Sequence, residues 1–390
     1  MAEARGTSVA VAGAMQKSLL ARLSSIAAFI LFGATAAQAA TLTLAWDANP
    51  EPVSGYILYW GSQSGQYTQS LDVGKTTSRS LNGLANNTPY YFIVRAYNSA
   101  GMLSAPSIEV SRRVGVPYAT AADISGDLKT DLTVFRPANG TWYSWFSGST
   151  TTWATQWGNG SDIPVAGDYD GDLRTDLAVF RPANGTWYFR YAKGTSSGIQ
   201  WGNGLDKPVA GDYDGDGKTD VAVFRPTNGT WYVRNSSNGA SVGTAWGNSA
   251  DTPVPADYDG DGKTDIAVFR PGNGTWYVMY SNTGRSVGVQ WGNAADVPVP
   301  GDYDGDGKAD IAVFRPSNGT WYIVLSSTGA STGKQWGNAS DIPVPGDYDG
   351  DGRTDVAVFR PSNGTWYITY SSGGQGGFQW GNGQDIPIKK

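Results

Sequence analysis

The 390-residue sequence contains no histidine and no cysteine. Without histidine, a Ser-His-Asp triad, a histidine-ligated zinc site and imidazole acid–base catalysis are excluded. Without cysteine, the chain has no thiol chemistry, no thiolate metal ligand and no disulfide bond. Only 16% of the residues are charged, whereas 40% are hydrophobic, so the chain can build large cores.

Glutamate is also scarce. The chain has three (Glu3, Glu51 and Glu109), so 31 of its 34 acidic residues are aspartate. Aspartate favours turns, because its short side chain bonds to nearby backbone amides. The 53 glycines and 16 tryptophans both exceed average usage. This composition predicts carboxylates held in tight turns rather than spread along helices.

Residues 1–40 are typical of a secretory signal peptide. Basic residues precede an apolar run over 23–37, and the small-residue pattern Ala37-Gln38-Ala39 follows. A retained membrane anchor is the alternative, although the run is shorter than the roughly 20 residues that span a bilayer. We expect cleavage near Ala39 or Ala40 and a secreted or extracellular protein, with attachment at the cell surface left open. No later segment is long and apolar enough to span a membrane.

Residues 41–114 contain three short runs of alternating apolar and polar residues, 41–46, 55–60 and 90–97, separated by turn-rich pieces. This spacing predicts an antiparallel β-sandwich. With Trp46 on an early strand and Gly83-Leu84-Ala85-Asn86-Asn87-Thr88-Pro89-Tyr90 later, the segment resembles a fibronectin type III domain. The resemblance implies that Tyr90 hydrogen-bonds to the preceding loop and that the domain is a spacer or a binding module.

Residues 115–390 repeat one unit six times, with a period of 44 to 45 residues. Each full unit has four short strand-forming runs and an Asn-Gly hairpin signal, which favours a type I′ turn with positive φ at both central residues. Four strands per roughly 45 residues indicate the blade of a β-propeller. A linear β-solenoid is the alternative. The predicted fold is therefore all-β, a sandwich followed by a propeller of four-stranded antiparallel sheets.

Closure of the propeller can be predicted from the two ends of this region. The first unit lacks a regular first strand, because Val116-Pro117-Tyr118 lies at the wrong distance from Asp123. The chain ends with a surplus strand signal, Asp385-Ile386-Pro387-Ile388. We expect this tail to pair with the strand near Leu132–Phe135 and to complete a ring of six blades.

Each unit carries an aspartate loop of the pattern Asp-x-Asp-Gly-Asp-Gly-x-x-Asp. Glycines at positions 4 and 6 let the chain fold tightly, so carboxylates at positions 1, 3, 5 and 9 and the carbonyl oxygen of position 7 can surround a cation. Oxygen-only ligand sets select hard cations, and outside the cell that cation is Ca²⁺. The predicted ligands, with Arg and Lys acting through their carbonyl oxygens, are Asp168, Asp170, Asp172, Arg174, Asp176, Asp212, Asp214, Asp216, Lys218, Asp220, Asp257, Asp259, Asp261, Lys263, Asp265, Asp302, Asp304, Asp306, Lys308, Asp310, Asp347, Asp349, Asp351, Arg353 and Asp355.

These ligand sets predict about five Ca²⁺ sites and a degenerate sixth. The second loop has Leu173 in place of its second glycine, which weakens it. The first loop has lost a carboxylate and a glycine, so we expect weak or no binding by Asp123, Ser125, Asp127 and Asp131. The six loops hold 23 of the 31 aspartates, and such carboxylates repel one another unless they are neutralised. Aspartate turns solvated by water are the alternative.

These loops, together with the element Phe-Arg-Pro-x-Asn-Gly-Thr-Trp-Tyr, resemble the FG-GAP/VCBS repeats of integrin α-subunit propellers, fungal propeller lectins and secreted bacterial proteins. The resemblance covers residues 115–390 and implies calcium-binding blades. It does not imply one function, because that family includes adhesins, lectins and lyase scaffolds.

The face opposite the aspartate loops is a candidate ligand face. If the aspartate loop joins the first and second strands, the Arg-Pro-x-Asn-Gly hairpin lies at the other end of the blade. Indole rings can stack on sugar C–H groups, and Arg or Asn can bond to hydroxyls. Packing between blades is the alternative explanation for residues that recur in every blade. The candidate residues are Arg225, Trp231, Trp246, Arg270, Trp276, Trp291, Arg315, Trp321 and Trp336.

The sequence favours a non-catalytic protein of adhesion or glycan recognition. The propeller has no Glu, no His and no unique acid–base pair, although a calcium-dependent polysaccharide lyase or hydrolase and a purely structural spacer remain alternatives. We expect a monomer that binds an extracellular glycan or a cell-surface protein. The net charge of −6 becomes more negative when the basic signal is removed, which argues against nucleic acid as a partner.

Overall fold

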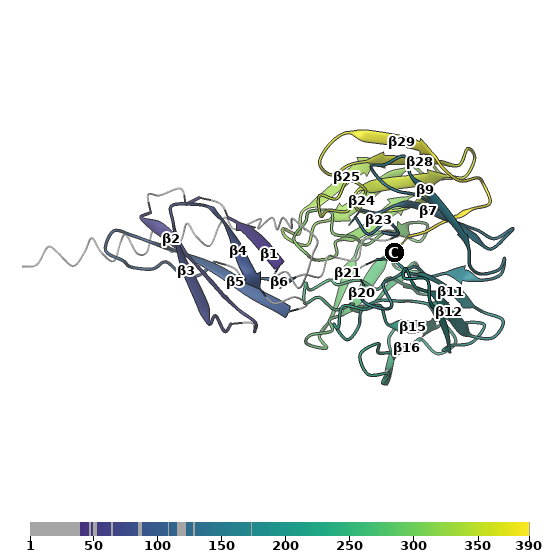
Figure 1. Ribbon diagram of the computed structural model, residues 1–390, viewed down its shortest axis with the longest axis horizontal. Coiled ribbons are helices and arrows are strands. Elements are labelled where there is room, and N and C mark those ends of the chain that lie inside the picture. Colours follow the sequence, from purple (N-terminus) through teal and green to yellow (C-terminus); the bar gives the residue numbers. More distant parts are fainter. Residues whose placement is uncertain are drawn as a thin grey trace, which may run out of the picture. The chain divides into compact units, whose positions relative to one another are not determined.

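The computed structural model describes residues 40–46, 48–49, 53–63, 65–84, 88–107, 109–114, 122–127, 129–172 and 174–389. Residues 1–39 of the predicted signal segment lie outside this part of the chain. The chain divides into two compact units, 1–116 and 117–390 (Figure 1). The regular elements of the described residues are all strands. Among these residues, no helix is long and apolar enough to cross a membrane.

The first unit is a β-sandwich, as predicted. In one sheet, β1 (Ala40–Ala45) pairs antiparallel with β4 (Ser78–Leu84). The other sheet has the order β3 (Gln69–Gly74), β2 (Gly55–Gly61), β5 (Thr88–Tyr97) and β6 (Val110–Val114). The two sheets enclose the core of this unit.

Trp46 belongs to the sandwich core, where it is 4% exposed and meets the edge of Tyr56 at 5.9 Å between ring centroids. Leu58 and Phe92 are fully buried beside it. Tyr90 packs against the same core, 6.3 Å from the Phe92 ring. The hydrogen bond expected from the Tyr90 hydroxyl to the preceding loop stays a prediction.

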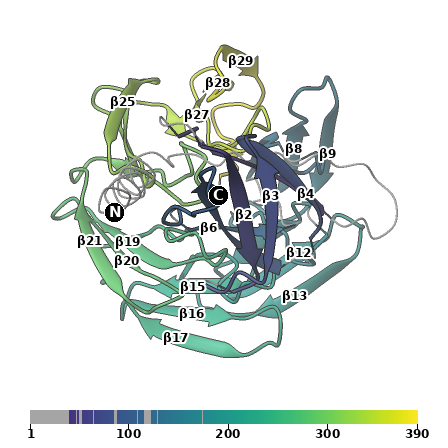
Figure 2. The ribbon, with the colours of Figure 1, turned by 90° about the vertical axis from the view of Figure 1, so that its left-hand side faces the viewer.

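The second unit contains six four-stranded antiparallel sheets, which form a ring of blades (Figure 2). Blade one has the order β30-β7-β8-β9, and blades two to six follow as β10–β13, β14–β17, β18–β21, β22–β25 and β26–β29. The strands are β7 (Leu132–Arg136), β8 (Thr141–Trp145), β9 (Thr152–Gln156), β10 (Ile163–Pro164), β11 (Leu177–Arg181), β12 (Thr186–Arg190), β13 (Ser196–Gln200), β14 (Lys207–Pro208), β15 (Val221–Arg225), β16 (Thr230–Arg234), β17 (Ser241–Ala245), β18 (Thr252–Pro253), β19 (Ile266–Arg270), β20 (Thr275–Met279), β21 (Ser286–Gln290), β22 (Val297–Pro298), β23 (Ile311–Arg315), β24 (Thr320–Val324), β25 (Ser331–Gln335), β26 (Ile342–Pro343), β27 (Val356–Arg360), β28 (Thr365–Thr369), β29 (Gln375–Gln379) and β30 (Ile386–Pro387).

The predicted closure is confirmed. β30, at the end of the chain, pairs with β7 through Ile386 opposite Phe135 and Pro387 opposite Val134. The amide of Ile388 also donates to the carbonyl of Thr133 at 2.8 Å. Blade one is therefore built from both ends of the propeller sequence, which excludes the linear solenoid.

Burial within a blade follows strand order. In blade four, Ala267, Val268 and Phe269 on β19 are buried, and Trp276 and Val278 alternate with half-buried residues on β20. The last strand, β21, is mostly exposed. The core around Phe269 and Trp276 also includes Val313 of blade five, so neighbouring blades share one hydrophobic cluster.

The hairpin between the second and third strands forms, but the predicted type I′ turn is wrong. Four residues connect the strands in each blade, and in blade five Gly319 has φ of +62° while Asn318 keeps negative φ. Pro316 favours a helical first turn residue, so the glycine alone takes the left-handed conformation. Asn318 instead bonds through its side chain, accepting from the Thr320 amide at 3.1 Å and donating to the Tyr322 hydroxyl at 3.0 Å.

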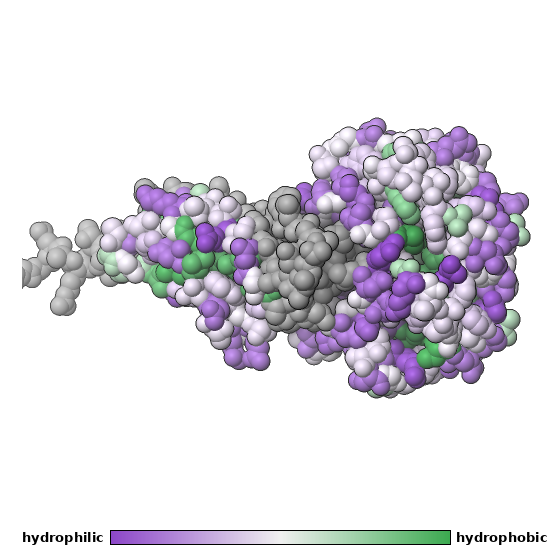
Figure 3. All heavy atoms as spheres, viewed as in Figure 1, coloured by the Kyte–Doolittle hydropathy of each residue, from purple (hydrophilic) through white to green (hydrophobic). Residues whose placement is uncertain are grey.

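The visible surface of the propeller is mostly hydrophilic or neutral, with small hydrophobic patches (Figure 3). Large hydrophobic residues that are at least moderately exposed include Leu205 at 71% and Val242 at 50%. The apolar side chains of the described blades are thus used mainly inside the blades and between them.

Candidate metal centre

The aspartate loops connect the first and second strands of the blades and are held by their own backbone. In blade four the amide of Asp265 donates to the carbonyl of Ala256 at 2.8 Å, which closes the loop. The carboxylate of Asp257 accepts from the amides of Gly260 and Gly262 at 2.6 and 2.8 Å. Gly260 has φ of +80° and Gly262 has φ of +85°, a backbone conformation that other residues rarely adopt. The predicted need for glycine at positions 4 and 6 is met in this geometry.

Five loops each bring three carboxylate oxygens within 4.8 Å of one another. The second, third and fourth loops use positions 1, 3 and 9, whereas the fifth and sixth use positions 1, 3 and 5. Within the described residues the first loop forms no such group, since Ser125 stands where the others have an aspartate. The groups are Asp168, Asp170 and Asp176; Asp212, Asp214 and Asp220; Asp257, Asp259 and Asp265; Asp302, Asp304 and Asp306; and Asp347, Asp349 and Asp351.

The structure thus gathers three of the four predicted carboxylates in each of these loops. The fourth carboxylate lies outside the group, and the predicted carbonyl ligands of position 7 stay a prediction. The carboxylates outside the groups are Asp172, Asp216, Asp261, Asp310 and Asp355.

Burial and mutual repulsion disfavour the charged form of these carboxylates when no cation is bound. Burial, with added repulsion from neighbouring aspartates, raises the pKa of Asp257, Asp302 and Asp347 to about 7. The glycine amides of positions 4 and 6 oppose this shift because they stabilise the charged form. The same causes raise the pKa of Asp259 to about 6.

The donor set fits a hard cation such as Ca²⁺. Asp259 Oδ2 and Asp170 Oδ1 are buried atoms that have no hydrogen-bond partner among the described residues. A buried polar atom without a partner costs free energy, and a bound cation would supply the missing interaction. The five groups therefore offer the oxygen ligands that a hard cation takes, and the second and fourth loops also hold buried carboxylate oxygens without a hydrogen-bond partner.

Serines that follow the third strand complete the surroundings of the loops in every blade but the second, and the sequence analysis missed them. In blade five the amide of Ser326 donates to Asp310 at 2.7 Å and its hydroxyl to Asp306 at 2.9 Å. The Ser327 hydroxyl donates to Asp304 Oδ2 at 2.5 Å. The Ser-Ser pair that recurs in blades three, five and six at a fixed distance after Trp-Tyr was the available signal.

The six loops are joined to one another in a closed ring. The amide at position 8 of each loop donates to the carbonyl oxygen at position 1 of the preceding loop, at 2.6–2.9 Å. Because the last loop connects to the first, no loop lies at an end of the series. The pairs are Thr130 with Asp347, Thr175 with Asp123, Thr219 with Asp168, Thr264 with Asp212, Ala309 with Asp257, and Thr354 with Asp302.

Side chains at positions 7 and 8 also cross to the preceding loop. A Cβ on Gly211 would lie 2.7 Å from the Thr264 hydroxyl oxygen. In blade four, Ala256 takes the place of this glycine, and the facing position 8 is Ala309 instead of threonine. The lysine at position 7 covers the neighbouring loop, since a Cβ on Gly260 would lie 3.1 Å from the Lys308 stem. Position 7 therefore contributes a side chain as well as the predicted carbonyl.

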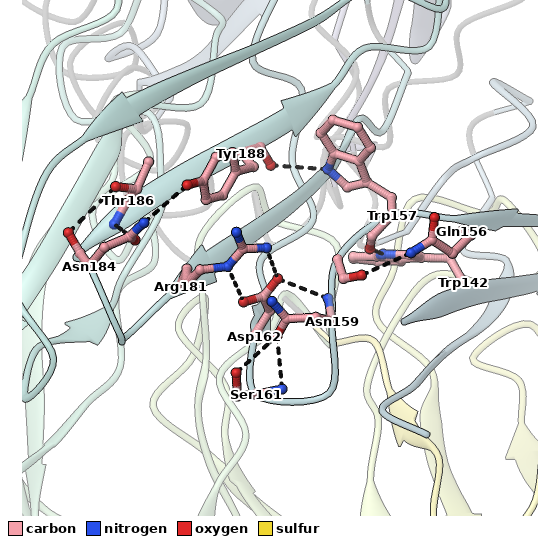
Figure 4. Close-up of polar contacts among 11 residues, drawn as sticks. Trp142, Gln156, Trp157, Asn159, Ser161, Asp162, Arg181, Asn184, Thr186 and Tyr188 are labelled. Carbon is pink, nitrogen blue, oxygen red and sulfur yellow. Dashed lines mark hydrogen bonds and ion pairs between the residues drawn. The ribbon is translucent and has the colours of Figure 1, made fainter. Parts of the chain in front are cut away.

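The opposite face carries one repeated ionic contact per blade, and Figure 4 shows the contact between Arg181 and Asp162. Arg181 makes a bidentate contact with Asp162, 2.8 Å at each nitrogen, and its guanidinium lies 4.4 Å from the centre of the Tyr188 ring. The Asp162 side chain is fully buried, and the Arg181 side chain is 27% exposed. Trp157 donates its indole N–H to the carbonyl of Tyr188 in the next blade at 3.1 Å. The arginine contacts thus lie within one blade, between its adjacent strands, whereas the indole contact joins neighbouring blades.

The structure corrects part of the candidate ligand face. Three of the predicted sugar platforms, Trp231, Trp276 and Trp321, are fully buried and donate their indole N–H groups to carbonyls of their own blades. They cannot stack on a sugar, because neighbouring blades cover them. The half-buried tryptophans, Trp246, Trp291 and Trp336, donate to the next blade. The arginines, Arg225, Arg270 and Arg315, are engaged with Asp206, Asp251 and Asp296.

Comparison with protein families agrees with this architecture. The model of the FG-GAP-like repeat matches residues 168–223, 212–268, 257–313 and 302–358, so each match begins at the first aspartate of a loop. The model of the fibronectin type III domain matches residues 31–112. The chain therefore combines an N-terminal fibronectin type III domain with FG-GAP-like repeats that form β-propeller blades.

Individual similar proteins match less of the chain or match it weakly. Receptor-type tyrosine-protein phosphatase S of Gallus gallus is 34% identical over 105 residues, which are 26% of this chain and 7% of that protein. TolB of Acinetobacter baumannii is 16% identical over 77% of this chain and 80% of its own, with a TM-score of 0.48. Virginiamycin B lyase of Staphylococcus aureus is 12% identical over 55% of this chain and 69% of its own, with a TM-score of 0.40. The propeller assignment rests on the six sheets of this chain.

The raised carboxylate pKa values predict an unusual pH dependence for the metal-free protein. Because the folded-state pKa values lie near 6 to 7 and the ordinary value is 3.8, the folded chain binds more protons than the unfolded chain. This contribution is complete at low pH and is lost as the pH rises through the folded-state values. With a chelator present, the melting temperature should therefore fall between about pH 4 and about pH 7. Saturating Ca²⁺ should remove this fall, and a chelated protein that melts higher at the upper pH would contradict it.

Proposed function

We propose that this chain is an extracellular, adhesion-type protein whose propeller is stabilised by Ca²⁺ and which has no catalytic activity of its own. The observation that carries the calcium part is the convergence of three carboxylate oxygens in each of five loops, with Asp259 Oδ2 left buried and unpartnered among the described residues. The combination of fibronectin type III and FG-GAP-like segments supports the adhesion part.

Calcium supplies the cross-linking that disulfides supply in other exported proteins. Extracellular calcium modules bind with dissociation constants of about 10⁻⁴–10⁻³ M. At roughly 1 mM free Ca²⁺ and the tighter limit, each site stabilises the folded state by about 1.4 kcal/mol, so five sites give about 7 kcal/mol. This is comparable to the whole stability of a typical domain, about 5–15 kcal/mol. A cysteine-free propeller gains its rigidity from these ions.

Export and partner binding both fit a calcium-stabilised propeller that acts outside the cell. The signal-like segment at residues 1–40 supports export into a medium that contains Ca²⁺. The chain has no histidine, its Glu residues lie outside the propeller, and the arginines of the opposite face are paired with buried aspartates. These features favour a binding role, with an extracellular glycan or cell-surface protein as the partner, over a polysaccharide lyase.

Removal of Ca²⁺ should lower the melting temperature of the full chain by roughly 15 °C or more, because about 7 kcal/mol is lost. Differential scanning calorimetry with Ca²⁺ and with a chelator measures this shift. Asp259→Asn adds a sharper test, since it should destabilise the protein in Ca²⁺ by about 1.4 kcal/mol and stabilise it in chelator by removing repulsion. Asp127→Asn in the first loop is the matched control and should shift the midpoint equally in Ca²⁺ and in chelator. Equal melting in both media would overturn the calcium proposal.

The adhesion part predicts calcium-dependent binding without product release. The labelled chain should bind members of a glycan array or a panel of extracellular matrix proteins in Ca²⁺ and should lose that binding in chelator. Polysaccharides incubated with the chain should keep their length. Unsaturated or shortened products would contradict the non-catalytic role, and no binding to either panel in Ca²⁺ would leave the chain as a spacer and contradict adhesion.

A further inference from the structure

Two consecutive residues after the third strand of each blade approach the aspartate loop, and the charge of the second one differs among blades. In blades three, five and six this position is Ser237, Ser327 or Ser372, and its hydroxyl donates to the position-3 aspartate. In blade four it is Asn282, and the corresponding Asp259 Oδ2 is a buried oxygen without a hydrogen-bond partner in the described chain. At this position, therefore, none of these four loops receives a positive charge.

Blade two places a cation at the same position. Lys193 follows β12, and its ammonium nitrogen lies 2.7 Å from Asp170 Oδ2. The Asp170 side chain is only 11% exposed, whereas the lysine side chain is 58% exposed, so the lysine reaches inward from solvent. The same nitrogen lies 5.3 Å from the centre of the Tyr191 ring, which supports it from the other side.

An ammonium at this distance competes directly with a metal ion. Asp170 belongs to the three-carboxylate group of its loop, so the lysine nitrogen occupies one of the oxygens that a cation would take. A lysine ammonium is a compact charge that repels Ca²⁺ at short range. Ala192 also replaces the first serine, so its backbone amide still donates to Asp176, at 2.8 Å, but no hydroxyl is available. The protein itself therefore neutralises this loop in part: Asp170 Oδ2 has the ammonium as its partner, whereas the buried Asp170 Oδ1 has no hydrogen-bond partner among the described residues.

The neighbouring first loop is also satisfied internally. The Ser125 hydroxyl lies 3.0 Å from an Asp127 oxygen and 3.3 Å from an Asp123 oxygen, in the place of the missing carboxylate. The first and second loops are adjacent in the ring, because the amide of Thr175 donates to the carbonyl of Asp123 at 2.9 Å. One side of the ring thus consists of two neighbouring loops that carry their own compensating groups.

We propose that Lys193 is a resident counter-ion that replaces Ca²⁺ in the second loop, so that blades one and two form a metal-independent part of the propeller and blades three to six bind the metal. This inference rests on the proposed calcium function and narrows it. It corrects the sequence expectation of five equivalent sites, because the second loop has a complete set of aspartates but an ammonium among them.

Two reciprocal substitutions test the role of this position. Lys193→Ser gives blade two the residue of blades three, five and six, and Ser327→Lys gives blade five the residue of blade two. Equilibrium dialysis of the full chain with radioactive Ca²⁺ counts the bound ions. The wild type should hold four tightly, K193S five and S327K three, with the affinity of the second loop rising at least about tenfold in K193S. Lys193→Gln, which keeps the length without the charge, should behave as K193S does.

The outcomes separate this inference from the calcium proposal. Binding of no Ca²⁺ by the wild type would contradict the proposed function itself. Normal binding by the wild type with the same count and affinity in K193S and K193Q would overturn only the role of Lys193. Thermal unfolding in chelator gives a second measurement, because S327K should melt higher than the wild type when its lysine neutralises the empty fifth loop. A lower midpoint for S327K in chelator would also contradict the inference.

Discussion

One hydrogen bond, repeated around the propeller, links every aspartate loop to its neighbour. The amide at position 8 reaches the carbonyl oxygen at position 1 of the preceding loop, and the six contacts close on themselves. A cation bound by one loop fixes the same position-1 residue whose carbonyl holds the next loop. The order of each loop therefore depends on its neighbours, and β30 is needed to make the series a ring.

The two faces of the propeller differ in how the charge of their buried aspartates is compensated. On one face, buried carboxylates repel one another and need a cation, a hydroxyl or an ammonium for compensation. On the other face, each buried aspartate already has an arginine, which also stacks on a tyrosine. With Ca²⁺ bound as proposed, a permanently paired face and an ion-dependent face would together take the place of the disulfides that this chain lacks.

Much of this architecture could be predicted because it is repeated. The strand runs, the six units and the surplus tail at Ile386 follow from the period, and the aspartate loops follow from their spacing. Contacts between units could not be predicted in the same way. The approach of Gly211 to Thr264 depends on which residues meet across blades, and the serines beside the loops and the partner of each arginine depend on which residues meet within a folded blade. Lys193 differs from the residue at this position in the other blades, and its role as a counter-ion can be inferred only from its contact with Asp170 in the structure. The tryptophans were ambiguous from the sequence because burial and sugar stacking both favour large aromatic rings.

Hydrogen exchange at the position-8 amides tests most directly whether the loops form one closed unit. In saturating Ca²⁺, the amides of Thr130, Thr175, Thr219, Thr264, Ala309 and Thr354 should exchange at one common slow rate, because opening any of them requires the ring to open. Widely different rates at these six amides, with some exchanging as fast as exposed loop residues, would show that the loops order independently and would contradict the account.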